Sequence, residues 1–544
     1  MNMGKKIKLL DCTLRDGGFI NDWNFGRDEI INIFERSISA GTDIIEVGFI
    51  DDRQPGDPDR TMFPDALSVN DAFGSLSRGS SMIVGMIDFG TCSIDRIIPC
   101  KDSVMDGIRV IFKKKDRFAA LDFCAKLKAL GYEVFVQPVS ITGYSDEEMT
   151  DLIRRVNELH PHAMSMVDTY GLLHEGGLLH YYELMDSNLD TDISIGYHAH
   201  NNFQLGYSNC IALIERNEQK REEERHTLVV DGSAFGMGKG AGNTPIELLA
   251  MYMNKHHGGT YDINQMLETI DVSIMEIYLK LPWGYSLKYY LAASNDCHPK
   301  YVQHLMQKRC LSIKSINEIL DTIDAKEKLA YNAEHIEELY HRYQTTDRDE
   351  KGDMGKLSEV LKSAPLLVIG PARSIKDESD KVKDFILKNK PVIITINYLP
   401  EDYYTDYIFI SNSKRYLSLE GRLAHMPQDV KPPVLIATSN VTRAKGDFDY
   451  RVDYEGLLDQ SFEIKDNSLI MLLTLVNRLG VKEVNLAGFD GYSTSVGENY
   501  FNVAMEYAFI KEKAQALNEY ANGALKRLSE DMKINFVTRT RYKF

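Results

Sequence analysis

The chain has 544 residues, enough for about two or three domains that each bury a core of their own. Its 43% hydrophobic and 26% charged residues are typical of a soluble globular protein, and its formal net charge of −17 argues against a nucleic-acid partner. No apolar stretch approaches the roughly 20 residues of a membrane span, and residues 1–8, short and basic, are expected to run straight into a strand rather than to form a signal peptide. Seven cysteines without disulfide-like spacing indicate a reducing cytoplasm.

Strand-like apolar runs alternate with amphipathic helical stretches over the first 250 residues or so. Eight such units match a (β/α)8 barrel in count and length better than a doubly wound open sheet. The predicted strands are 7–15, 43–49, 81–88, 107–112, 133–140, 163–169, 194–200 and 227–232. The helices predicted between them are 27–40, 118–130, 145–159 and 205–216.

Polar residues stand at the ends of these strands, where barrels of this class carry their chemistry. Asp16 follows the first strand, Glu46 lies late in the second, and Thr169 ends the sixth. His198 and His200 end the seventh strand and face the same side, because strand side chains alternate. The first and seventh strands both flank the eighth, so Asp16 can reach the same ion as the two histidines.

Arg15 and Asp16 are neighbours, so on a strand they would face opposite ways. Both reach one site only if the strand ends there, which the following pair of glycines predicts. A glycine-rich loop, 236–243 (GMGKGAGN), follows the eighth strand. One carboxylate, two imidazoles and this loop predict a site for a divalent metal, Mn2+ or Mg2+. The plain alternative for an isolated His-x-His is a pair of satisfied or exposed histidines.

Four segments are expected along the chain. Residues 1–260 form the catalytic barrel and 261–345, with apolar residues at helical spacing, form a helical appendage. Residues 346–363 form a polar linker, and 364–544 form a smaller Rossmann-like α/β domain. In that last domain the predicted strands are 366–369, 392–396, 407–410, 434–437 and 484–487, and the predicted helices are 374–388 and 467–479.

The first strand of the C-terminal domain runs into a turn of small residues at the start of a helix. Such a turn can cradle a phosphate, here with Gly370 and Ser374 at the turn and Arg373 pairing with phosphate oxygens. The turn lacks the full Gly-x-Gly-x-x-Gly and a Walker lysine, so an ordinary strand-to-helix turn stays equally open. The ligand would be a nucleotide or nucleotide-sugar; otherwise the domain serves assembly or docking.

Three motifs, at 11–17 (DCTLRDG), 198–202 (HAHNN) and 236–243, resemble the DRE-TIM-type metal-dependent lyase and synthase barrels. That superfamily includes hydroxymethylglutaryl-CoA lyase, isopropylmalate and homocitrate synthases, and 4-hydroxy-2-oxovalerate aldolase. The resemblance covers roughly residues 7–345. It is greatest to the oxovalerate aldolase, because of 240–247 (GAGNTPIE) and the helical appendage.

The resemblance implies a role for each matching residue. Arg15 would hold the substrate oxyanion, Thr169 would contact the substrate, and Tyr285 would be an active-site tyrosine. The implied metal ligands are Asp16, His198 and His200, with Asn243 added in some relatives. For Asn243 a structural alternative is the cap of the following helix.

The chain departs from the family at two places. Phe19 stands where the pyruvate-releasing aldolases carry their histidine base, so the base is open between Tyr285, His174 and a water on the metal. Residues 237–241 contain no cysteine, whereas the CoA lyases carry one in this loop, which argues against hydroxymethylglutaryl-CoA lyase activity.

The expected activity is divalent-metal-dependent cleavage or formation of a 4-hydroxy-2-oxo acid through a pyruvate-type enolate. Its partners would be a 2-oxo acid and an aldehyde, and the protein is expected to be a homo-oligomer. A Claisen-type synthase acting on an acyl-CoA is the alternative reaction. An iron(II) oxygenase uses a similar ligand set, but the barrel and the Arg-Asp-Gly motif oppose it. A non-enzymatic barrel that supports the C-terminal domain is the third possibility.

Overall fold

The computed structural model describes residues 6–308, 311–345, 350–427, 430–442, 448–459, 466–495, 497–502 and 509–544. The chain forms two compact units. The first contains Met1–Gln303 and Asp324–Tyr331, and the second contains His304–Ile323 and Asn332–Phe544. The boundary therefore falls inside the helical stretch expected at 261–345 and divides that stretch between the units.

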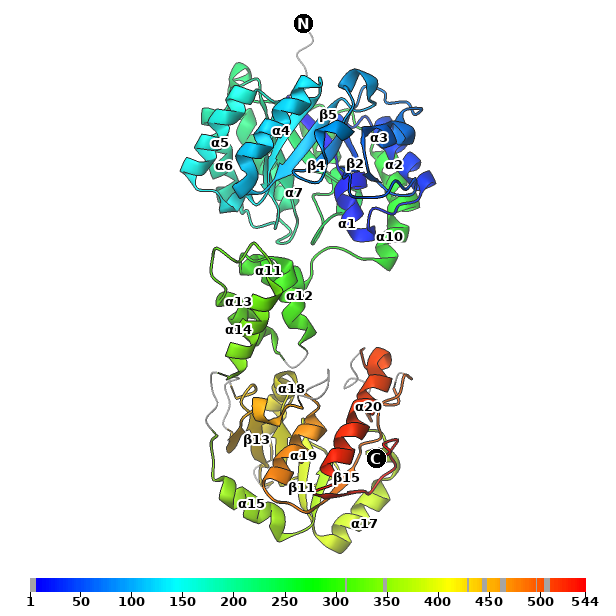
Figure 1. Ribbon diagram of the computed structural model, residues 1–544, viewed down its shortest axis with the longest axis vertical. Helices are drawn as coiled ribbons and strands as arrows, with labels where there is room; N and C mark the ends of the chain where they lie inside the picture. Colours follow the sequence, from blue (N-terminus) through cyan, green and yellow to red (C-terminus); the bar gives the residue numbers. More distant parts are fainter. Residues whose placement is uncertain are drawn as a thin grey trace. The chain divides into compact units, whose positions relative to one another are not determined.

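Within the described residues, the first unit is a closed barrel of eight parallel strands, as the sequence predicted. β1 pairs with both β2 and β9, which closes the sheet, and the short β3 (Met62–Phe63) adds to β2 outside the ring. The barrel strands are β1 (Ile7–Asp11), β2 (Ile44–Ile50), β4 (Met82–Asp88), β5 (Gly107–Phe112), β6 (Glu133–Pro138), β7 (Ala163–Asp168), β8 (Ser194–Ala199) and β9 (Leu228–Gly232) (Figure 1).

Helices cover the outside of the barrel through narrow apolar stripes. In α2 (Arg27–Ser39) the buried Ile30, Ile33 and Phe34 follow helical spacing. α5 (Asp146–Leu159) begins at a capping box between Ser145 and Glu148, which satisfies backbone donors at its first turn. The other helices are α1 (Gly18–Asn21), α3 (Ala66–Phe73), α4 (Arg117–Ala129), α6 (Glu175–Asn188), α7 (Gly206–Glu218) and α8 (Ile246–His256), of which the sequence had not predicted α1, α3, α6 and α8.

β1 ends at Asp11 rather than at residue 15 as predicted. The Asp11 carboxylate accepts hydrogen bonds from the Thr13 amide at 2.9 Å and the Thr13 hydroxyl at 2.5 Å, and so turns the chain out of the strand. One helical turn, Thr13–Gly17, follows. Arg15 and Asp16 lie on this turn, where strand alternation does not apply. The paired glycines beyond them therefore do not end the strand.

The helices that follow the barrel are shared between the two units. A return segment, Asp324–Tyr331, belongs to the barrel unit: Tyr170, just after β7, donates from its hydroxyl to the Leu329 carbonyl at 3.2 Å. The His298 amide donates to the Lys328 carbonyl at 2.8 Å. These contacts place the segment at the carboxyl-end face of the barrel. The helices are α9 (Ile263–Thr269), α10 (Met275–Lys280), α11 (Leu287–Ser294), α12 (Pro299–Gln307), α13 (Ile313–Asp321) and α14 (Ala333–Thr345).

The second unit contains an all-parallel sheet of seven strands within the described residues, in the order β14-β13-β12-β11-β10-β15-β16. The order reverses between β10 and β15, as in doubly wound sheets. Its strands are β10 (Leu366–Ile369), β11 (Val392–Ile396), β12 (Tyr407–Ile410), β13 (Val434–Thr438), β14 (Tyr450–Val452), β15 (Glu483–Ala487) and β16 (Lys533–Phe536). Its helices include α16 (Ser374–Asp377), α17 (Ser379–Asn389), α18 (Ser413–Ala424), α19 (Ser468–Arg478) and α20 (Phe509–Leu528).

The linker expected at 346–363 is helical in its second half, and residues 346–349 lie outside the described part. α15 (Met354–Ser363) starts at Asp353, whose side chain accepts from the Lys356 amide at 3.0 Å. It buries Leu357 and Leu361 in the core of the second unit. Among all the residues that the structure describes, no helix is long and apolar enough to cross a bilayer.

Candidate metal centre

Asp16, His198 and His200 come together at the carboxyl ends of β1 and β8. His198 Nε2 lies 3.9 Å from Asp16 Oδ1, and His200 Nδ1 lies 3.9 Å from Asp16 Oδ2. All three side chains are buried, and one ligand atom from each lies within 4.8 Å of the others. This spacing suits three donors around one ion.

Among the described residues, two buried atoms of this region have no hydrogen-bond partner: Nδ1 of His200 in the cluster and Oδ1 of Asn243. Burial lowers the pKa of His200 to about 3, so its ring is neutral near pH 7 and can present a lone pair from Nδ1. Asn243 donates from Nδ2 to the Met237 carbonyl at 3.2 Å, which leaves Oδ1 as a free acceptor. The donors therefore fit a divalent cation. Asn243 does not cap α8, whose N-cap is Pro245, so the capping alternative is wrong.

The glycine-rich loop holds the cluster through its backbone. The Lys239 amide donates to Asp16 Oδ2 at 3.1 Å, and the Asn201 amide donates to the Gly242 carbonyl at 2.8 Å. Gly242 has φ +88°, and a Cβ there would lie 2.1 Å from the Gly236 carbonyl oxygen, so only glycine fits. The loop thereby fixes the carboxylate from β1 against the residues that follow β8.

Gly238 lies between two candidate ligands. A Cβ there would lie 2.3 Å from Asn243 Nδ2 and 2.6 Å from Asp16 Oδ2. We expect Gly238→Ala to displace both side chains and to weaken Mn2+ binding by at least about 10-fold in calorimetric titration. Gly176→Ala is the matched control, because a Cβ at Gly176 in α6 meets nothing within 4 Å. Equal affinity in Gly238→Ala and the parent would contradict this geometry.

Arg15 joins the cluster to a buried carboxylate on β2. Its Nη1 lies 2.5 Å from Asp16 Oδ1, and its Nε donates to Glu46 Oε2 at 2.7 Å. Burial raises the pKa of Asp16, but the positive charge of Arg15 beside it opposes burial most strongly, and that pKa lies well below its usual value. Asp16 is therefore ionised at neutral pH, and Glu46 orients the guanidinium rather than the ion.

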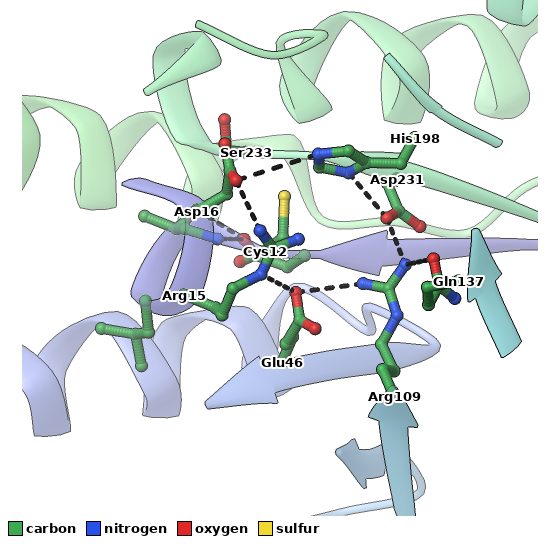
Figure 2. Close-up of polar contacts among 12 residues, drawn as sticks. Cys12, Arg15, Asp16, Glu46, Arg109, Gln137, His198, Asp231 and Ser233 are labelled. Atoms are coloured by element: carbon green, nitrogen blue, oxygen red, sulfur yellow. Dashed lines mark hydrogen bonds and ion pairs between the residues drawn. The ribbon is translucent and has the colours of Figure 1, made fainter. Parts of the chain in front are cut away.

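A second arginine continues this network to His198 (Figure 2). Arg109 on β5 pairs through Nη1 with Glu46 Oε2 at 3.0 Å and through Nη2 with Asp231 Oδ2 at 2.5 Å. Asp231 on β9 lies 2.9 Å from His198 Nδ1. With Nδ1 engaged, Nε2 is the His198 atom that faces Asp16. A carboxylate behind a metal-binding imidazole fixes the ring and its tautomer.

The sequence analysis had not singled out Arg109 and Asp231. A signal was present, because each is a charged residue within an apolar strand, GIRVIF and LVVDG. Charged side chains that are fully buried must be paired. Their partners come from strands far apart in the chain, so the pairing itself could not be read locally.

Phe19, which stands where the aldolases that this chain resembles have a histidine base, belongs to an aromatic cluster beside the metal cluster. Phe19 packs against Trp23 and Phe49, with ring centroids 4.7 and 6.1 Å apart. Arg15 lies over Phe49 at 5.7 Å, and the Lys239 ammonium lies over Phe19 at 5.3 Å. Phe19 is 40% exposed. This wall is apolar but carries a cation at each end.

The other expected site residues differ in their positions. Thr169 follows β7 and accepts the Ser140 amide on Oγ1 at 2.7 Å, which leaves its own proton free. Tyr285 is 63% exposed, and no hydrogen bond or ion pair joins it to the metal cluster within the described residues. His174 is exposed and packs on Phe203 at 5.5 Å. The positions of Tyr285 and His174 therefore support neither residue as the catalytic base.

The turn at Gly370–Ser374 already holds an anion from the chain itself. The Ser374 amide donates to Asp490 Oδ2 at 2.9 Å, and its hydroxyl also contacts that carboxylate. A Cβ on Gly370 would lie 2.5 Å from the Gly488 carbonyl oxygen, and Arg373 donates outward to the Gly497 carbonyl at 3.3 Å. α16 is only four residues long. The predicted phosphate cradle is therefore filled by a carboxylate, which would repel phosphate.

Comparison with known proteins adds to this geometry. Residues 113–277 match the family described as HMGL-like. The chain is 24% identical over 286 residues to the 4-hydroxy-2-oxovalerate aldolase of Shewanella halifaxensis, which covers 51% of this chain and 80% of that protein. It is 22% identical over 270 residues to the oxaloacetate decarboxylase of Mycobacterium tuberculosis, which covers 48% and 74%. The solved hydroxymethylglutaryl-CoA lyase from Pseudomonas aeruginosa is 18% identical, with 51% of this chain and 94% of that chain covered and a TM-score of 0.41.

Proposed function

We propose, starting from the HMGL-like domain of this lyase-type barrel, that the protein is a divalent-metal-dependent aldolase for a 4-hydroxy-2-oxo acid. The observation that carries the proposal is the buried set of Asp16, His198 and His200 with the unpartnered Oδ1 of Asn243. Oxygen and imidazole donors of this kind suit Mn2+ or Mg2+. When bound, the ion supplies Lewis-acid stabilisation to charge on the keto oxygen of a 2-oxo acid.

The chain's own residues would bind and orient the substrate. Arg15 is buried and permanently charged, and its position beside Asp16 supports a role in holding the oxyanion of the enolate. Thr169 has a free hydroxyl proton to donate to substrate. In cleavage the C3–C4 bond breaks, its electron pair stays on C3 of the pyruvate half, and the 4-hydroxyl proton passes to a base as the aldehyde leaves.

Phe19 favours a second candidate reaction, the decarboxylation of a 2-oxo diacid. Cleavage of a hydroxy acid needs a base for the hydroxyl proton, whereas loss of CO2 from the carbon next to a keto group needs none at that step. The match to a protein named oxaloacetate decarboxylase supports this candidate. The same enolate forms, and the same ligands and Arg15 would stabilise it.

The test separates enolate formation from the choice of substrate. Pyruvate is incubated with the protein in D2O with Mg2+ or Mn2+, and deuterium at its C3 is measured by mass spectrometry. This exchange reports formation of the enolate alone. Release of pyruvate from 4-hydroxy-2-oxopentanoate, coupled to lactate dehydrogenase, reports aldol cleavage, and release from oxaloacetate above the spontaneous rate reports decarboxylation. Thiol release from acetyl-CoA with a 2-oxo acid would instead favour the Claisen-type synthase. No exchange and no product with either ion would overturn the proposal.

Cytoplasmic location is also part of the proposal. The cysteines of the described residues, Cys12, Cys92, Cys100, Cys124, Cys210 and Cys297, are all free, and most of them are buried. Free buried thiols are typical of proteins that work in a reducing compartment.

A further inference from the structure

The side chain of Lys239, in the glycine-rich loop beside the metal cluster, has no role in the proposed reaction. Its backbone amide anchors Asp16, but its side chain extends away over the Phe19 ring. The ammonium makes no hydrogen bond and no ion pair with any described residue. The Lys239 side chain is half-buried, and holding a charged group partly out of water without a partner is costly, so such groups often await a ligand or mark a functional site.

The surroundings of Lys239 carry further positive charge. The Lys300 amide donates to His298 Nδ1 at 3.1 Å, and burial, together with the charges of Lys239 and Lys300, lowers the pKa of His298 to about 4. His298 is therefore neutral near pH 7. Lys300 is exposed and likewise has no ion pair within the described residues. The acidic groups whose charges reach Lys239 are Asp16, already held by Arg15, and Asp88.

We propose that Lys239, assisted by Lys300, binds a second anionic group of the substrate. This group is a carboxylate or a phosphate on the aldehyde half, and the inference rests on the proposed function. The pyruvate half would occupy Arg15 and the metal cluster, and the chain beyond C4 would pass along Phe19 to the ammonium. An anion there would pair with Lys239 while the apolar wall of Phe19, Trp23 and Phe49 excludes water. The favoured acceptors are thus anionic aldehydes rather than simple alkyl aldehydes.

The experiment measures acceptor selectivity with the full-length, Mg2+-loaded protein. Pyruvate is offered with propanal as the neutral acceptor, with glyoxylate or succinic semialdehyde as carboxylates, and with glycolaldehyde phosphate as the phosphate, and adducts are quantified by mass spectrometry. We expect kcat/KM for at least one anionic class to exceed that for propanal by more than 10-fold. Lys239→Met should lower that ratio by roughly 10- to 100-fold, the usual cost of one charge-assisted hydrogen bond, and Lys239→Arg should keep most of it.

Lys288→Met is the matched control, because Lys288 also lies over an aromatic ring, that of Tyr289 at 4.3 Å, but its charge is not among the largest that act on Asp16 or His200. Its selectivity ratio should equal that of the parent. Thermal unfolding and Mn2+ affinity of Lys239→Met show whether the variant is folded and loaded, and Lys239→Arg keeps the test valid if it is not.

The outcomes separate this inference from the proposed function. If pyruvate exchanges its C3 protons but anionic acceptors react no better than propanal, the anion site is wrong and the metal-dependent enolate chemistry stands. If Lys239→Met slows reactions with propanal and anionic acceptors equally, Lys239 serves the pyruvate half, and the inference also fails. If pyruvate neither exchanges nor adds to any acceptor, the proposed function itself fails.

Discussion

Asp16→Asn is expected to abolish tight Mn2+ binding and to reduce pyruvate C3 exchange by at least about 1,000-fold, since one ligand and most of the negative charge at the ion are lost. The substitution keeps the shape of the side chain, so the fold should persist. It also leaves Arg15 paired with Glu46 alone. Elemental analysis after gel filtration and calorimetric titration with Mn2+ would measure the loss of the ion.

Asp190→Asn provides the control for Asp16→Asn. Asp190 is an exposed aspartate between α6 and β8, and its carboxylate pairs with no described residue. This variant should bind Mn2+ and exchange pyruvate protons as the parent does. Parent-like Mn2+ affinity in Asp16→Asn would mean that the ion, if there is one, is held by a different set of residues.

The largest effect on stability is expected for Arg109→Met. Arg109 is 1% exposed and lies between Glu46 and Asp231, which are equally buried, so its removal leaves carboxylates in the barrel interior with one cation fewer. Breaking a buried ion pair from one side costs about 3–5 kcal/mol in the free energy of unfolding. Both tryptophans, Trp23 and Trp283, belong to the barrel unit, so urea titration followed by tryptophan fluorescence reports that unit alone.

Two further variants make the Arg109 prediction specific. Arg154→Met removes an arginine that also pairs with two carboxylates, Asp151 and Glu158, but at the surface, and should cost below about 1 kcal/mol. The double variant Arg109→Met/Asp231→Asn should be less destabilised than the sum of the single changes, because it removes an unpaired buried charge. A loss for Arg109→Met no larger than that for Arg154→Met would mean that the buried network adds little to stability.

Much of the barrel could be predicted from sequence because its signals are local. Each strand is a short apolar run between turn signals, and the candidate ligands His198 and His200 lie two residues apart at the end of one such run. Asp16 was placed beside them by the strand order, which the pairing of β1 and β8 with β9 confirms. The site could therefore be assembled before any side-chain geometry was known.

The parts that could not be predicted depend on side chains from distant segments. β1 ends early because one carboxylate captures a threonine two residues on, a competition that periodicity does not reveal. The pairing of Arg109 with Asp231 joins residues 122 positions apart. α15 is only ten residues long, too short for a helix to be stable by itself, and it forms because Leu357 and Leu361, one helical turn apart, pack in the core of the second unit.

The closing seam of the barrel sets the order in which the metal centre is completed during protein synthesis. Asp16 leaves the ribosome early, whereas the loop amide that holds its carboxylate lies 223 residues later in the chain. Only the pairing of β1 with β9 brings the two together, so a nascent chain that stops before β9 carries Asp16, His198 and His200 without the strand that aligns them. If the protein takes up an ion as proposed, we expect uptake to be a late event in biogenesis, and bound Mn2+ on ribosome-stalled chains would report the moment at which the ring of strands closes.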